Sequence, residues 1–139
     1  MKCIRVAMLV FLDAAGSLLL NRRNDSSVEL WGLLGGGIEP GEEPLSAIKR
    51  EILEEVRYEL SEDTDRLELI GTFQTTFDDL TADVHVFKAA FPGFELLSSS
   101  DEVAISDLKL VTLSQALNLP LLPLAQTILE SNGILTLHD

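Results

Sequence analysis

The stretch GGGIEPGEEPLSAIKREILEEV, residues 35–56, joins a glycine-rich segment to an acidic segment with helical periodicity. Pro44 suits the first turn of a helix, and Glu42 and Glu43 before it suit the positive end of that helix. We therefore predict a helix from about Pro44 to Tyr58, preceded by a glycine-rich loop.

One face of the predicted helix is apolar. At roughly 100° per residue, four side chains fall within about 80° of one another and form a buried stripe; they are those of Leu45, Ile48, Ile52 and Val56. Glu51, Glu54 and Glu55 are three and four residues apart, so their carboxylates share one flank of the helix. Glu55 lies beside the row of Ile48, at the edge of the predicted core.

This acidic flank needs a balancing positive charge. Like-charged neighbours at these spacings destabilise a helix by roughly 0.2–0.5 kcal/mol per pair. Arg50 and Arg57 lie at spacings that reach Glu54, and neither is expected to reach Glu51 or Glu55. A hard divalent cation is the natural candidate, because Mg²⁺ takes oxygen ligands and is typically bridged by carboxylates to a substrate's phosphates. The alternative is a solvated acidic face.

The glycine-rich segment does not match two familiar phosphate-binding loops. Gly36-x4-Gly41 has Walker spacing, but two glutamates follow where that loop has Lys and Ser or Thr. Gly35-x-Gly37 lacks the third glycine of a dinucleotide-binding fingerprint. An acidic residue at the end of the loop repels a bare phosphate but suits a phosphate that arrives with a metal.

Loop and helix together resemble the Nudix box, G-x5-E-x7-R-E-U-x-E-E-x-G-U, in which U is aliphatic. Seven of the nine specified positions match, namely Gly36, Glu42, Arg50, Glu51, Ile52, Glu54 and Glu55. Arg57 and Tyr58 stand where the family has glycine and an aliphatic residue, and Leu34 replaces the proline common before the paired glycines. Because a non-glycine residue in a left-handed turn costs about 1 kcal/mol or more, one expectation is that the helix runs on towards Ser61.

The resemblance implies a metal site on the predicted helix. Glu51, Glu54 and Glu55 would hold Mg²⁺ (or Mn²⁺), assisted by the main-chain carbonyl of Gly35. In the family, the arginine of the box pairs with the first glutamate and fixes the loop on the helix, which here implies a pair between Arg50 and Glu42.

The resemblance also implies an activity. Nudix hydrolases cleave a nucleoside diphosphate linked to another moiety by attack of water on phosphorus. Nucleoside triphosphates, oxidised ones included, and nucleotide sugars are the expected substrates. Three alternatives stay open: a diphosphatase acting on a non-nucleotide compound, a non-catalytic Nudix-fold module that binds nucleotide, and an acidic interface for a strongly basic protein.

The rest of the chain indicates the fold that surrounds this motif. Its apolar runs indicate strands in mixed order with the helices, so we expect an α/β (α+β) fold, a Nudix-like mixed β-sheet sandwiched between helices, in a single domain over residues 1–139. The predicted strands cover residues 2–12, 17–22, 67–77, 82–91 and 108–113, a short apolar segment covers 28–33, and shorter helices cover 114–118 and 122–131. Gly71 indicates a bulge in its strand, and Gly133 a stop after the last helix.

Other candidate site residues lie outside the motif. Arg22 and Arg23 end the second strand, and alternation aims them at opposite faces, so one of them is expected to meet a substrate phosphate or base. Simple strand-end charges are the alternative. Trp31 would stack on a base or pack in the core. For the general base we choose Glu102 or Asp101, for which solvated loop acids are the alternative.

Composition limits the partners. The 139 residues carry 10 Lys+Arg and 23 Asp+Glu, a net charge of −13, and such a surface repels a nucleic-acid backbone. No apolar run approaches the roughly 18 residues of a membrane span. The sole cysteine, Cys3, forms no internal disulfide, which favours a reducing, cytoplasmic compartment. The leucine-rich stretch 108–129 suits packing on the sheet or a dimer contact, so a monomer and a homodimer both stay open.

Overall fold

The first apolar run forms the central strand, β1 (Lys2–Leu12), of a seven-stranded mixed sheet. It pairs in parallel with β6 (Leu80–Ala90) over its whole length and antiparallel with β4 (Leu34–Gly37) on its other edge. The remaining strands are β2 (Leu18–Arg23), β3 (Leu30–Gly32), β5 (Glu68–Phe77) and β7 (Leu108–Val111). The strand order is β3-β2-β1-β6-β5, and β7 pairs with β2. This computed structural model describes residues 2–23 and 29–131.

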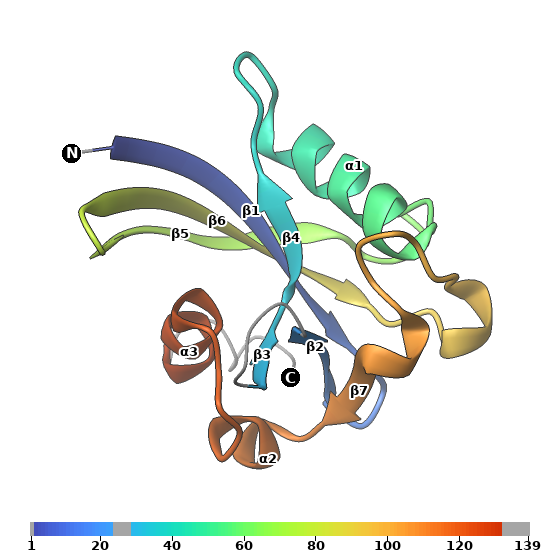
Figure 1. Cartoon of the computed structure of the whole chain (residues 1–139). Helices are drawn as coiled ribbons and strands as arrows, with labels where there is room; N and C mark the ends of the chain where they lie inside the picture. Colours follow the sequence, from blue (N-terminus) through green and yellow to red (C-terminus); the bar gives the residue numbers. More distant parts are fainter. Residues whose placement is uncertain (1, 24–28, 132–139) are drawn as a thin grey trace.

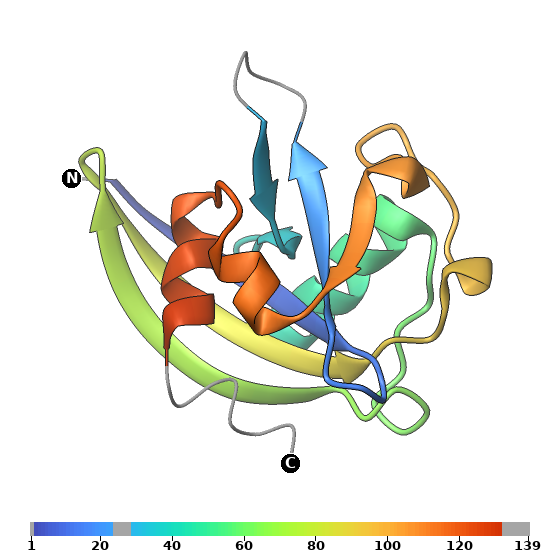
Figure 2. The same ribbon diagram turned by 90° about the horizontal axis from the view of Figure 1, so that it is seen from below.

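Helices cover both faces of the sheet (Figures 1 and 2). The helix α1 (Pro44–Val56) packs on β1 and β4, whereas α2 (Leu113–Leu117) and α3 (Pro123–Glu130) lie on the opposite side. Two short 3₁₀ helices, η1 (Phe94–Leu96) and η2 (Ile105–Asp107), lie between β6 and β7. The expected mixed sheet between helices is therefore confirmed.

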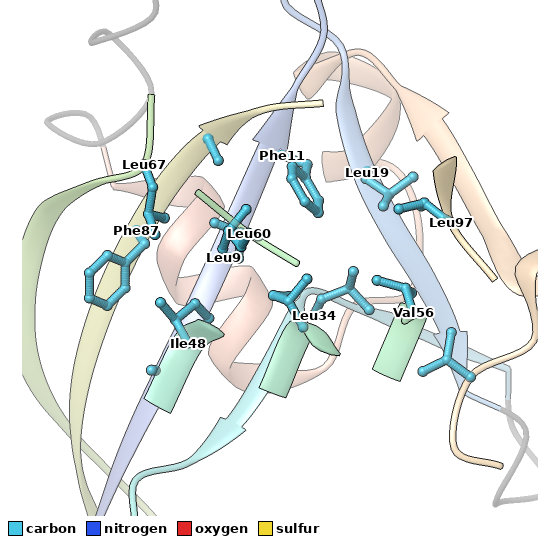
Figure 3. Close-up of a cluster of buried hydrophobic side chains, with 14 of the residues drawn as sticks. Leu9, Phe11, Leu19, Leu34, Ile48, Val56, Leu60, Leu67, Phe87 and Leu97 are labelled. Atoms are coloured by element: carbon cyan, nitrogen blue, oxygen red, sulfur yellow. The ribbon is translucent and has the colours of Figure 1, made fainter. Parts of the chain in front are cut away.

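Alternate side chains of β1 point to opposite faces of the sheet and pack in two separate cores. Leu9 and Phe11 point to the α1 side, where they pack with Ile48 and Val56 (Figure 3). Val10, between them, points to the other face and packs in the cluster under α3. The predicted stripe of α1 is confirmed, since three of its members are fully buried and Leu45 is partly buried. Burying one such side chain stabilises the fold by roughly 1.5–3 kcal/mol, so these two layers fix α1 and α3 on the sheet.

The strand β4 was not expected, because the sequence predicts a loop where three successive glycines occur. The structure instead pairs these glycines with Val6, Ala7 and Met8 of β1. At Gly35, φ is 138°, and a Cβ there would collide with the main-chain oxygen of Ala7. Main-chain pairing therefore makes this strand, and only glycine permits the close approach at this position.

The end of α1 also differs from the expectation. The helix stops at Val56, and Arg57 adopts the left-handed conformation with φ 58° and ψ 33°. The N–H of Arg57 donates to the main-chain oxygen of Leu53 at 3.1 Å, which closes the last turn. The expectation that the helix runs on towards Ser61 is wrong, because the surrounding fold holds a non-glycine residue in the conformation that the family's glycine favours.

Replacing Arg57 with glycine should stabilise the protein. Glycine enters the left-handed region without the Cβ penalty, although its greater freedom in the unfolded chain offsets part of the gain. We expect the free energy of unfolding to rise by about 0.5–1 kcal/mol in urea titrations. Arg57→Ala removes the same side chain but keeps the Cβ, so an equal gain in both variants would contradict the explanation.

Tyr58 compensates for the other departure from the motif. Its ring lies edge-on to Phe11, with the centroids 6.4 Å apart, and packs against the α1-side core. Its hydroxyl donates a 2.6 Å hydrogen bond to Asp65, a buried carboxylate. Burial and this bond raise the pKa of Tyr58 to about 12. A tyrosine thus fills the aliphatic position and also satisfies a buried acid.

The other predicted elements agree with the structure to within about two residues. The predicted irregularity in β5 is present as a register shift between Leu69 and Gly71. A capping box at Thr112 starts α2 one residue earlier than expected. Val28, the start of the predicted apolar segment, and Gly133, the predicted helix stop, lie outside the described residues. None of the helices in the described ranges has the length and apolar composition needed to span a bilayer.

Candidate active site

The helix α1 presses its acidic flank against the glycine strand β4. The N–H of Gly35 donates a 2.9 Å hydrogen bond to Oε1 of Glu55. A Cβ on Gly36 would lie 2.6 Å from the carboxylate of Glu51. The two glycines therefore give one helix carboxylate a hydrogen-bond donor and leave room for the other.

Three carboxylates meet at this junction. Oxygens of Glu51, Glu55 and Glu102 lie within 4.8 Å of one another, with Glu102 contributed by the loop that precedes β7. Oxygen donors in this number and at this spacing fit a hard divalent cation such as Mg²⁺ or Mn²⁺. Glu54 is not in this group; its half-exposed carboxylate pairs with Arg50 at 3.2 Å.

Glu55 is a buried acid, with only 8% of its surface exposed. Burial raises the pKa of Glu55 to about 8, and the charges of Glu51 and Glu102 act in the same direction. The N–H of Gly35 and the charge of Arg23 oppose this shift. Burial also raises the pKa of Glu51. Acids held in so unfavourable an environment cluster at functional sites, and a bound cation restores their charged form.

Arg50 ties the glycine strand, the following loop and the helix together. Its Nε and Nη2 donate to the two carboxylate oxygens of Glu42 at 2.8 and 2.9 Å, and Nη2 also donates to the carbonyl oxygen of Gly37. This contact lowers the pKa of Glu42 to about 2. The expected pair is confirmed. The expectation that Arg50 does not reach Glu51 is wrong, since Nη1 donates to Glu51 at 3.0 Å and to Glu54 at 3.2 Å.

Ser100 holds the loop that carries Glu102. Its hydroxyl donates to the main-chain oxygen of Glu55 at 2.7 Å and accepts from the N–H groups of Glu102 and Val103 at 3.2 and 3.1 Å. The N–H of Ser98 adds a 2.9 Å bond to the main-chain oxygen of Val56. The loop is therefore fastened to the last turn of α1, and this places Glu102 opposite Glu55.

Replacing Ser100 with alanine should loosen this loop. The variant leaves two loop N–H groups and one helix carbonyl without their hydroxyl partner. We expect a loss of about 1–3 kcal/mol in the free energy of unfolding, measured in urea. Ser114→Ala, at an exposed position in α2, is the control. Equal stability of the Ser100 variant and wild type would show that the hydroxyl does not anchor the loop.

A cavity of about 460 Å³ opens beside the carboxylates. Its walls come from β2, α1, the Glu102 loop and η2, and include Asn21, Arg22, Arg23, Glu55, Glu102 and Asp107. Arg22 donates to Asp107 at 2.6 and 3.1 Å and pairs with Glu29 at 3.3 Å. The charge of Arg23, in contrast, acts on Glu55. Both arginines thus border the site, and Arg22 is engaged by Asp107 of the wall and by Glu29.

A second, more apolar groove of about 280 Å³ adjoins the glycine strand. It lies between β1, β4 and the first turn of α3, and its lining includes Val6, Met8, Gly35 and Leu122. Arg23 lines this groove as well as the cavity beside the carboxylates. The predicted substrate contact Trp31 lines neither of them among the described residues. It is buried in the cluster under α3.

Three residues of the site were not singled out from the sequence: Asn21, Ser100 and Asp107. Asn21 could have been predicted as a special position, because it is a polar residue directly after three leucines. Those leucines alternate between the two cores of the structure. Ser100 and Asp107 lie in polar loop segments without periodicity, so their sequence context does not distinguish them from solvated residues.

An acidic helix behind a glycine strand, on a mixed sheet between helices, defines the Nudix class of proteins. The family model described as "NUDIX domain" matches residues 1–131. This chain therefore belongs to the NUDIX domain family.

Known proteins support the same class. The solution structure of the E. coli ORF135 protein superimposes with a TM-score of 0.76 at 26% identity, covering 100% of this chain and 93% of that one. The crystal structure of a MutT protein from Methanosarcina mazei Go1 gives a TM-score of 0.68 at 21% identity, covering 89% and 87%. A protein named "Putative 8-oxo-dGTP diphosphatase" from Bacillus subtilis (strain 168) is 33% identical over 99 residues, 70% of this chain. This chain spans 60% of that relative's length. These similarities support the NUDIX fold and family.

Proposed function

We propose that this chain is a divalent-metal-dependent pyrophosphohydrolase that cleaves the diphosphate linkage of a nucleoside di- or triphosphate derivative. The observation that carries the proposal is the meeting of Glu51, Glu55 and Glu102 beside a cavity bordered by arginines. As the resemblance to the Nudix box implies, Glu51, Glu54 and Glu55, with the carbonyl of Gly35, would hold Mg²⁺ or Mn²⁺. Glu54 lies outside the cluster of Glu51, Glu55 and Glu102, so its role as a ligand stays a prediction. When bound, the cation neutralises the diphosphate and lowers the pKa of the attacking water.

The protein groups divide the remaining work. Glu102 lies on a solvent-exposed loop opposite Glu55, and we assign it the acceptance of the proton from the attacking water. Arg50 and Glu42 hold the glycine strand on the helix and so keep the carboxylates in position. Arg23 is the arginine we assign to a phosphate oxygen, because its charge already acts on Glu55. Arg22 and Trp31 stay predictions as substrate contacts.

The apolar groove is the proposed place for the nucleoside. It adjoins Gly35 and Gly36, and apolar side chains from β1 and α3 suit the face of a base. The Bacillus subtilis relative is named for 8-oxo-dGTP, which makes oxidised nucleoside triphosphates one candidate class. Other nucleoside triphosphates and nucleotide sugars are the others.

The cellular setting belongs to the same proposal. The net charge of −13 disfavours nucleic acid and anionic membranes as partners, and a small phosphate compound would bind together with its cation. Cys3, the sole cysteine, is exposed and free, which suits the reducing cytoplasm. We propose one Nudix-type domain over residues 1–139, acting as a monomer or homodimer.

A substrate panel tests the activity. Purified protein is incubated with Mg²⁺ and nucleoside triphosphates (8-oxo-dGTP included), nucleotide sugars, dinucleotides and non-nucleotide diphosphates, and the products are separated by chromatography. Cleavage of one nucleotide class supports the proposal. Cleavage of only non-nucleotide compounds would redefine the substrate. Nucleotide binding, seen as a rise in Tm, without turnover would show a binding module, and no effect of either metal or nucleotide would favour a protein interface.

A further inference from the structure

Asn21 is a buried polar side chain whose hydrogen-bonding groups are not used within the described fold. Only 6% of the residue is exposed, yet its carboxamide forms no side-chain hydrogen bond with any residue in the described ranges. Among the described residues, the fully enclosed side-chain atoms without a partner are Nε1 of Trp31 and Nδ1 of His85, so the amide of Asn21 is not sealed in the core. Here the side chain lines the cavity beside the carboxylates, so its open side faces that space.

The strand β2 explains why an amide is found at this position. Leu19 points to the core on the α1 side, and alternation puts Asn21 and Arg23 on that same side of the strand. The main chain of Asn21 pairs with Gly32 of β3 and Leu108 of β7, so strands flank it on both edges. The backbone is therefore fixed, and only the side chain is left to meet a ligand in the cavity.

The cavity itself selects the kind of ligand. Its wall combines Arg23, Glu55 and Glu102, which are assigned above to a phosphate oxygen, the cation and the proton of the attacking water. An amide presents two N–H donors and one acceptor oxygen. A diphosphate presents only acceptors when fully charged, so the amide NH₂ is the complementary group.

We propose that Asn21 is a substrate-binding residue whose side-chain NH₂ donates a hydrogen bond to an oxygen of the bound diphosphate. The assignment rests on the proposed function for the identity of the ligand. In this arrangement the positive charge of Arg23 attracts the diphosphate. The neutral donor of Asn21, held on a paired strand, fixes the orientation of one phosphate.

A binding experiment tests this role without depending on turnover. The probe is methylene diphosphonate with Mg²⁺, whose P–C–P bridge is not hydrolysed, titrated calorimetrically into the full chain. Asn21→Leu keeps the branched shape and removes the donor, and Asn21→Ala serves as a second variant that cannot clash. Asn118→Leu, at an exposed asparagine after α2, is the matched control. Tm is measured for every variant.

We expect both Asn21 variants to bind the probe about tenfold to a hundredfold more weakly than wild type. Their Tm should be equal to or higher than that of wild type, because no hydrogen bond of the described fold is lost. The Asn118 variant should bind like wild type. A structural role, for instance through a trapped water, predicts instead a lower Tm for both Asn21 variants.

Several results would overturn the assignment: Asn21 variants that bind the probe as well as the control does, a fall in Tm that accompanies the loss of binding in both variants, or a wild type that does not bind the probe with Mg²⁺. The proposed activity fails by a different result. A wild type that binds the probe through Asn21 but cleaves no diphosphate would refute hydrolysis and leave the binding role standing.

Discussion

Replacing Glu55 with glutamine should lower kcat by at least about a hundredfold and leave the fold intact. Glutamine keeps the shape of the side chain and an oxygen that can accept from the N–H of Gly35, a bond that measures 2.9 Å in the wild type. It removes the negative charge from the most buried of the three clustered carboxylates. Hydrolysis is proposed to need a cation at this cluster. Loss of the negative charge should weaken the binding of that cation and so lower kcat.

The measurement is Mg²⁺-dependent hydrolysis of the best substrate in the panel, together with Tm. Glu59→Gln is the matched control, because Glu59 is exposed and lies outside the cluster. It should retain wild-type kcat. Turnover by the Glu55 variant within a few fold of wild type would remove this residue from the proposed metal site.

The metal-free protein should lose stability as the pH rises from about 5 to about 8. Burial places the folded-state pKa of Glu55 at about 8, above the ordinary value of 4.5. The folded state therefore binds this proton more tightly than the unfolded state does. The contribution of the Glu55 proton to the free energy of unfolding is complete below pH 4.5 and is lost as the pH passes through 8. The free energy of unfolding should fall by an amount on the order of a few kcal/mol.

Mg²⁺ should reverse this trend, because it binds the charged carboxylate and its binding releases the proton. We expect the rise in Tm on adding Mg²⁺ to be much larger near pH 8.5 than near pH 6. Urea titrations of wild type and Glu55→Gln across this range check the assignment. If the variant shows the same pH slope as wild type, Glu55 is not the group that titrates.

Periodicity predicted the helix and its buried face correctly. Ile48, Ile52 and Val56 recur at helical spacing, and a helix packed on one side needs such a stripe. The resemblance to the Nudix box likewise predicted the pair of Arg50 with Glu42, which the structure confirms. Both features depend on residues close together in the chain, so a local sequence pattern is enough to predict them.

Other features depend on contacts between distant segments. The strand β4 has almost no side chains to mark it, and it exists because β1 offers its main chain as a partner. The left-handed Arg57 needs tertiary support that no local preference reveals. Ser100 binds a carbonyl in α1 across 45 positions of the chain. The sequence therefore predicts the acidic flank of α1 more easily than it predicts how the neighbouring loop and strand are placed against that flank.

The structure distinguishes Glu102 from its neighbour Asp101. A serine-rich acidic loop suggested Asp101 and Glu102 equally, and only the structure brings Glu102 within reach of Glu51 and Glu55. Arg22 and Arg23 form a similar case. Their alternation was clear, but the acids that engage Arg22 come from η2 and from the segment before β3.

The most direct test of the account is to hydrolyse the best nucleotide substrate in ¹⁸O-labelled water, with and without Mg²⁺, and to locate the label by mass spectrometry. We predict turnover only when the cation is present, with one labelled oxygen on a phosphorus of the cleaved diphosphate. Two results would contradict a metal-dependent attack of water on phosphorus in the site formed by Glu51, Glu55 and Glu102. They are turnover that is independent of a divalent cation, and label found outside the phosphate products.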